Sequence, residues 1–181
     1  MKKFKLTSEF IVDISGVKLF RIKALIEFGN VKAGDLGGYI EKEENLSHMG
    51  DAWVSDDARI SGNAQVFGNA QVFGDAQVFG NAWVFGDARV SGNARVSGDA
   101  RVSGDAWVFG DKDYAYAHGF GSCNRTTTFF RLKDGDVGVR CGCFYGTLAQ
   151  FRDKVCETHG ETKKAQEYLM LADLMEIRFK N

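Results

Sequence analysis

A repeat of six residues runs through the middle of the chain and constrains its fold more than any other feature. From Gly50 to Phe109 the sequence reads as ten successive hexads of the form Gly-Asp/Asn-Ala-x-Val-x, in which x varies. The third position is always Ala, from Ala52 to Ala106, and the fifth is Val in every hexad except at Ile60. Short repeats of this kind are typical of solenoids, in which each unit buries its apolar face against the next unit.

The two fixed apolar positions of the hexad are two residues apart, so in a strand their side chains point to the same side. Ala-x-Val-x therefore predicts a short strand with an inward face. Gly-Asp/Asn predicts a corner, because these residues tolerate positive φ. Three edges of six residues close a coil of eighteen residues, and stacked coils pair as parallel strands about 4.8 Å apart. We predict a parallel β-helix of about three coils over residues 50–112.

The overall composition favours a folded protein of the cytoplasm. A hydrophobic content of 44% argues against disorder. The formal net charge of -1, from 23 basic and 24 acidic residues, gives no general affinity for nucleic acid. No apolar run has the length of a signal peptide or of a membrane span. We therefore expect no membrane partner and no nonspecific binding of nucleic acid.

The variable positions of the hexads are expected to point outward and to stack in columns, because residues eighteen apart share a face. Arg89, Arg95 and Arg101 should then lie on three different faces. Exposed aromatic patches usually mark interfaces, so we predict a homo-oligomer, most simply a trimer. Its predicted interface consists of the outward aromatic residues Trp53, Phe67, Phe73, Phe79, Trp83, Phe85, Trp107 and Phe109. The alternatives are that the terminal segments fold back over one face, or that a ligand binds there.

The segments on either side of the repeat are predicted to be an N-terminal β cap over residues 1–49 and a small α+β module over residues 113–181. A solenoid needs a cap because its open end exposes unpaired backbone groups. The sequence pattern of the module predicts strands over Thr126–Leu132 and Val137–Cys143, and helices after Thr147 and over about 161–177. The fold class is therefore mainly β, with two helices at the C-terminal end.

Several stretches together resemble a family of phage- and prophage-encoded hexapeptide-repeat proteins. They are the hexads and residues 19–25, 34–47, 141–148 and 159–160, and the Gly-Gly-Tyr-Ile-Glu-Lys-Glu-Glu-Asn-Leu-Ser element is the most specific of them. The resemblance covers nearly the whole chain and implies a left-handed coil. It also implies a phage accessory protein that binds and inhibits a host defence component or sequesters its nucleotide signal.

Other hexapeptide-repeat proteins are acyltransferases that use a histidine base at a subunit interface. The histidines here are His48, His118 and His159, none within the ten hexads. His118 is the only plausible base, and His48 is expected to pack near the cap. Three histidines at such places do not match the zinc site of a carbonic anhydrase-like β-helix. The spacing of Cys141 and Cys143 is not that of a zinc site, so buried thiols, no metal and no cofactor are expected.

We predict function by binding rather than by turnover, and we place recognition on the C-terminal module. The rod repeats too few residue types to encode a unique site, which leaves a structural scaffold as an alternative. Aromatic and arginine side chains suit both protein hot spots and pockets that stack a base and hold a phosphate. The predicted binding residues are Tyr114, Tyr116, His118, Phe120, Arg125, Arg131, Arg140, Phe144, Tyr145 and Thr147.

Two questions stay open at this point. The partner is a host protein or a small nucleotide, and about half of the aromatic residues of the module are expected to form its core. The helix start at Thr147 would offer free N–H groups to an anion beside Arg140. The alternative there is an ordinary capped helix.

Overall fold

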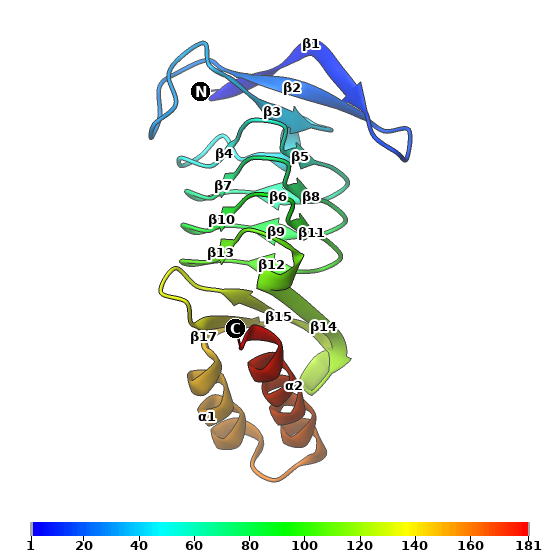
Figure 1. The fold of residues 1–181 in the computed structure, drawn as a ribbon, viewed down its shortest axis with the longest axis vertical. Helices are drawn as coiled ribbons and strands as arrows, with labels where there is room; N and C mark the ends of the chain where they lie inside the picture. Colours follow the sequence, from blue (N-terminus) through cyan, green and yellow to red (C-terminus); the bar gives the residue numbers. More distant parts are fainter. Residues whose placement is uncertain (1, 181) are drawn as a thin grey trace.

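The computed structural model describes residues 2–180 as an elongated rod with a β cap at one end and an α+β module at the other (Figure 1). The cap and its junction with the rod contain β1 (Phe4–Val12), β2 (Lys18–Ala24) and β3 (Leu36–Ile40). The rod strands are β4 (Trp53–Val54), β5 (Arg59–Ile60), β6 (Gln65–Val66), β7 (Gln71–Val72), β8 (Gln77–Val78), β9 (Trp83–Val84), β10 (Arg89–Val90), β11 (Arg95–Val96), β12 (Arg101–Val102) and β13 (Trp107–Val108). The module contains β14 (Tyr114–Phe120), β15 (Arg125–Arg131), β16 (Val137–Cys141), β17 (Phe144–Thr147), α1 (Leu148–His159) and α2 (Lys163–Phe179). The expected mainly β fold with two C-terminal helices is confirmed.

The rod consists of three sheets of parallel strands, one on each face. The first sheet has the strand order β3-β5-β8-β11, and the antiparallel strands β2 and β1 extend it beyond β3. The second sheet has the order β4-β7-β10-β13, and the third has the order β6-β9-β12. Trp53 pairs with Gln71, and Gln71 pairs with Arg89, which confirms the coil of eighteen residues. The ladder also extends before Gly50, because β3 pairs in parallel with β5 and Leu46 bridges to Val66. The rod therefore has about four coils rather than three.

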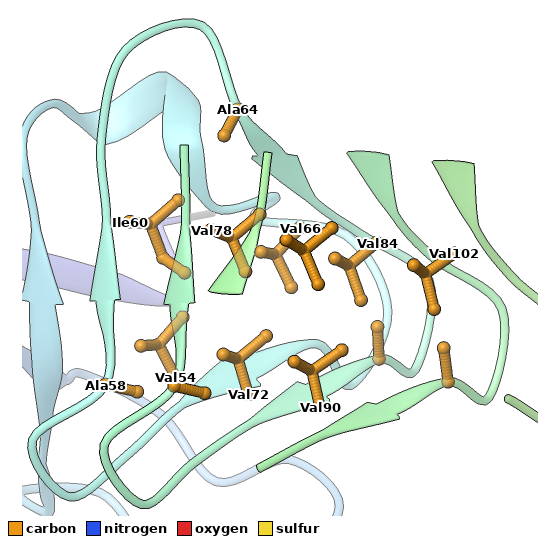
Figure 2. Close-up of a cluster of buried hydrophobic side chains, with 14 of the residues drawn as sticks. Val54, Ala58, Ile60, Ala64, Val66, Val72, Val78, Val84, Val90 and Val102 are labelled. Carbon is orange, nitrogen blue, oxygen red and sulfur yellow. The ribbon is translucent and has the colours of Figure 1, made fainter. Parts of the chain in front are cut away.

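The core of the rod is formed by the two fixed apolar positions of the hexad. Every such Ala, Val and Ile side chain from Ala52 to Val108 is fully buried. Figure 2 shows part of this core, with Val54, Val72 and Val90 in one inward row. The corner glycines have positive φ, for example +71° at Gly68. A Cβ there would lie 3.0 Å from the nitrogen of Gly86 in the next coil. The corner thus needs glycine both for its conformation and for the close stacking of coils.

The hydrogen bonds of the parallel ladders join each coil to the coils on both sides of it. The N–H of Trp53 donates to the carbonyl of Ala70, and the N–H of Gln71 donates to the carbonyl of Ala88, at 3.0 and 2.9 Å. Because the edge of a parallel sheet carries both kinds of backbone group, each end of the rod presents N–H groups and carbonyls. Because buried backbone groups must be paired, the two caps must supply hydrogen-bond partners for the ends of the rod.

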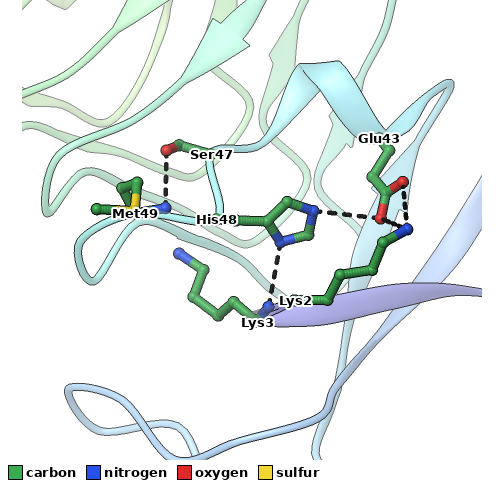
Figure 3. Close-up of polar contacts among 6 residues, drawn as sticks. All are labelled: Lys2, Lys3, Glu43, Ser47, His48 and Met49. Atoms are coloured by element: carbon green, nitrogen blue, oxygen red, sulfur yellow. Dashed lines mark hydrogen bonds and ion pairs between the residues drawn. The ribbon is translucent and has the colours of Figure 1, made fainter.

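Lys3 supplies donors at the N-terminal end. Its ammonium is within the cap and donates to the carbonyls of Gly50 and Ala52, at 3.1 and 2.7 Å. Burial lowers the pKa of Lys3 to about 8, and the nearby Asp51 carboxylate opposes that shift. The backbone of Lys3 is itself held, because its N–H donates to Nδ1 of His48 at 3.2 Å (Figure 3).

The other ring nitrogen of His48 lies 3.2 Å from the Glu43 carboxylate, which also pairs with Lys2 (Figure 3). The ring stacks on Phe4 with centroids 4.4 Å apart. His48 therefore packs in the cap, as the sequence predicts.

The C-terminal end is closed by side-chain acceptors and by the Tyr114 hydroxyl, which donates to the carbonyl of Arg95. Three N–H groups of the last coil donate to side-chain oxygens at 2.8 to 3.0 Å, in the pairs Arg95 to Asp111, Arg101 to Thr128 and Phe109 to Asp113. Adjacent residues of β15 then face opposite layers, with Phe130 in the rod core and Phe129 in a second core with α1 and α2. The sheet of the module therefore forms a layer between the rod and the two helices (Figure 1).

The expectation that every variable position faces outward is wrong for Trp53. Its side chain is only 7% exposed, because the Phe28 ring packs edge-on at 5.3 Å and the backbone of Gly37 lies against it. Trp53 is covered by the N-terminal segment of its own chain, so it cannot form an oligomer interface. The expectation that terminal segments fold back over the rod therefore holds at this position.

Replacement of Asn45 by Ala tests the cap. The Asn45 amide donates to the carbonyls of Gly62 and Ala64 at 3.1 and 2.8 Å and is fully buried. Asn63, one coil later in the same column, is exposed and donates only to Asn81. We expect Asn45→Ala to lower the free energy of unfolding by about 1–3 kcal/mol or more, because it leaves buried carbonyls unpaired. Asn63→Ala should lower the free energy of unfolding clearly less. Equal losses in urea denaturation would contradict this account of the cap.

Candidate functional site

A pocket of about 690 Å³ opens where the rod meets the C-terminal module. Its lining includes three arginines from three separate segments, namely Arg101 of β12, Arg125 of β15 and Arg140 of β16, together with His118 of β14. Asp99 is the one carboxylate among the residues that line it. Because the whole chain has a net charge of -1, this concentration of cations is local to the pocket.

Arg101 and Arg140 both lie over aromatic rings of the rod. The guanidinium carbon of Arg101 is 4.8 Å from the centre of the Trp83 ring, and that of Arg140 is 5.4 Å from the centre of the Phe85 ring. Arg140 reaches the rod because side chains alternate along β16, and its neighbour Val139 faces the helices. Contacts of this kind hold a cation in place without neutralising it.

The rings under these arginines form one cluster on a single face of the rod. Phe67 stacks on Phe85 at 4.8 Å and meets Trp83 edge-on at 5.9 Å. Phe67, Trp83 and Phe85 belong to the predicted oligomer interface, but two of the three support pocket arginines. Their second role was missed because the rod and the module are far apart in the sequence.

Arg125 is held by the hairpin turn between β16 and β17. Gly142 occupies that turn with a φ of +58°, and a Cβ on it would overlap the Arg125 guanidinium. The absence of a side chain at Gly142 is therefore what gives Arg125 its place at the wall of the pocket.

The turn before Arg125 is constrained and anchored to α2. Cys123 and Asn124 are consecutive non-glycine residues with positive φ, 62° and 45°, a conformation that is uncommon and costly. The N–H of Ser122 donates to the hydroxyl of Tyr168 at 3.0 Å. Burial raises the pKa of Tyr168, so this hydroxyl stays neutral. The surrounding fold thus maintains the strained wall of the pocket.

His118 and Asp99 have polar partners of their own. A ring nitrogen of His118 lies 2.9 Å from the Thr126 hydroxyl, so its partner is not a carboxylate. Asp99 accepts from the side-chain amide of Asn81 at 3.0 Å, and Asn81 in turn accepts from the side-chain amide of Asn63. Asp99 is therefore hydrogen-bonded to the rod, and its carboxylate is one negative charge beside three arginines.

The structure brings only three of the ten predicted binding residues, His118, Arg125 and Arg140, into this pocket. Phe120 is 44% exposed but is not among the residues that line it. The others have structural contacts: Tyr114 donates to the carbonyl of Arg95, Tyr116 and Tyr145 lie against the corner glycines Gly98 and Gly104, Phe144 packs on Phe151, and Arg131 donates to the carbonyls of Gly135 and Phe179. Arg101 and Asp99 were missed because recognition was placed on the module alone.

The candidate anion site at Thr147 is wrong. Thr147 and Gln150 form a capping box, in which Gln150 N–H donates to the Thr147 hydroxyl at 3.3 Å and Thr147 N–H donates to the Gln150 side chain at 2.9 Å. Arg140 faces the rod rather than this helix. The helix start is an ordinary cap.

The four cysteines are free thiols, and the expectation that they are buried is wrong for Cys123, Cys143 and Cys156, which are exposed. Cys141 is half-buried and accepts from the Thr127 hydroxyl. Between residues 2 and 180, no three His, Cys, Asp or Glu side chains are grouped so as to hold a metal ion. In the same range, neither helix has the length and apolar character to cross a membrane.

Comparison with known families agrees with the architecture. A family model described as the YdcK β-solenoid repeat matches residues 58–74, 76–92, 88–104 and 94–110, all within the rod. No curated protein matches the chain. The chain is therefore a β-solenoid repeat protein, and its similarity to this family is confined to the repeats.

Proposed function

We propose that this chain is a binding protein that holds a phosphate-bearing ligand in the junction pocket without turnover. The observation that carries the proposal is the convergence of Arg101, Arg125 and Arg140 on one pocket in a chain with a net charge of -1. Guanidinium groups bind phosphate oxygens through paired, charge-assisted hydrogen bonds. Three of them around one concave space match an oxyanion better than a neutral ligand.

The arrangement of these arginines supports binding of a small molecule. Two of them rest on aromatic rings before any ligand arrives, so less side-chain freedom is lost on binding. A concave pocket with a few convergent polar groups is the usual form of a small-molecule site. A host protein is the alternative partner, and its recognition would use the exposed aromatic residues outside the pocket.

The resemblance to phage-encoded hexapeptide-repeat proteins extends this proposal to biology. In that setting the chain is an accessory protein of the host cytoplasm, its coil is left-handed, and the ligand is a nucleotide signal of host defence. Acyl transfer is less well supported, because His118 contacts a hydroxyl rather than an orienting carboxylate.

Substitution of Arg101 tests the proposed ligand site. Arg89 is a matched control, because it occupies the same hexad position on another face and lies 5.5 Å over Trp107. We expect ADP-ribose, a cyclic dinucleotide or inorganic pyrophosphate to raise the melting temperature, since a ligand stabilises by RT ln(1 + [L]/Kd). Arg101→Gln should weaken that binding about tenfold or more, the effect of one lost charge-assisted bond. Arg89→Gln should leave it unchanged. If none of these probes stabilises the wild-type chain, the proposal is wrong.

We also propose a homo-oligomer, most simply a trimer, that buries the aromatic residues still open on the rod. Phe73 and Phe109 stand thirty-six residues apart in one column, with Ser91 between them, and Phe109 is 51% exposed. Exposed apolar side chains of this kind favour association.

The assembly is tested by Phe73→Glu combined with Phe109→Glu, because two carboxylates in one column should oppose burial against another subunit. The expected result is a lower mass by light scattering at micromolar concentration. Ser61→Glu, at the equivalent position on another face, should keep the wild-type mass. A monomeric wild-type chain would contradict the proposed assembly.

A further inference from the structure

A second pocket, of about 200 Å³, adjoins the junction pocket. It lies between the turn before β15 and the two helices, and Arg125 and Cys143 line both pockets. Arg125 is therefore the wall that the two spaces share.

The second pocket has an aromatic wall with one accessible ring. Phe144, Phe151 and Tyr168 line it, and the centroid distances from Phe151 to the other two rings are both 5.6 Å. Phe151 and Tyr168 are only 3% and 2% exposed, whereas Phe144 is half-buried. Phe144 is thus the ring that a planar ligand group can stack on.

The rim of this pocket is also cationic. Its cations are Lys154 and Arg125, His159 lines it as well, and no carboxylate is among its described lining residues. Lys154 pairs with Glu157 at 2.8 Å, so its charge is partly satisfied. An apolar floor beneath a cationic rim matches a planar ring that carries a phosphate on one side.

We propose that the two pockets are the halves of one nucleotide site, an inference that rests on the function proposed above. The base enters the smaller pocket and stacks on Phe144, and the first phosphate lies on Arg125. The larger pocket far exceeds the size of one phosphate. It therefore holds a second phosphate-linked unit beside Arg101 and Arg140, so the ligand class is a dinucleotide or an ADP-ribose-type nucleotide.

Gly142 is a positioning residue in this arrangement. A methyl group there displaces only the end of a flexible side chain, the Arg125 guanidinium. Gly135, in the preceding hairpin turn of the same sheet, has a φ of +90° and open space around it. Gly142→Ala and Gly135→Ala therefore place the same residue in a left-handed turn conformation, but only Gly142→Ala moves Arg125.

The experiment is calorimetric titration of the full chain with two probes, ADP-ribose and inorganic pyrophosphate. We expect Gly142→Ala to lower the affinity for both probes about tenfold or more, and Gly135→Ala to change the affinity for neither. Phe144→Leu keeps an apolar side chain but removes the ring. It should weaken ADP-ribose about tenfold, a stacking contribution of the usual size, and leave pyrophosphate unchanged. Arg125→Gln, which leaves the turn intact, replaces Gly142→Ala if that variant does not fold.

The outcomes separate the two proposals. If neither probe binds the wild-type chain, both proposals are wrong. If both probes bind but Phe144→Leu changes neither or weakens both equally, the base does not use the second pocket, and the junction site stands alone. If Gly142→Ala and Arg125→Gln leave both affinities unchanged, Arg125 is not the shared phosphate contact, and the further inference is overturned.

Discussion

The need to pair the backbone groups at both ends of the rod is the constraint on which the rest of this structure depends. Parallel ladders join the coils, so the first and last coils carry the backbone groups that have no partner within the rod. Donors from Lys3 and Asn45 close the first end. Acceptors from Asp111, Asp113 and Thr128 close the second. The polar side chains of the caps follow from this need, since each cap must pair the buried backbone groups at its end of the rod.

The pocket is a consequence of how the second end is closed. Because Thr128 must reach the backbone of Arg101, β15 lies against the last coil, and its neighbour β16 brings Arg140 over the Phe85 ring. Arg101 projects from the same coil into the same space. The regular rod thus supplies one cation and the aromatic supports, and the irregular module supplies the remaining cations. Neither part has this arrangement alone, which is why the site lies at their junction.

Much of the fold is readable from the sequence because its signals are local and periodic. The hexad predicts the inward Ala and Val rows and the columns of eighteen, and the Thr147 cap and the β15–β16 hairpin are visible in their own residues. The burial of Trp53 under Phe28 and the contact of Arg140 with Phe85 depend on long-range packing, for which no sequence pattern exists. Because the contact between the module and the rod is long-range, the sequence indicates Arg125 and Arg140 of the module as binding residues. It gives no sign that Arg101 of the rod joins them.

The central claim is that the junction, rather than a face of the rod, is where this protein binds an anionic ligand. An amide NMR titration of the full chain with inorganic pyrophosphate tests it most directly, because every segment is observed at once. The account predicts shifts in residues 118–126, in residues 140–144 and at Arg101, with little change in β5 and β8. Shifts confined to the rod face of β5 and β8 or to the N-terminal hairpin, or no shifts at all, would contradict it.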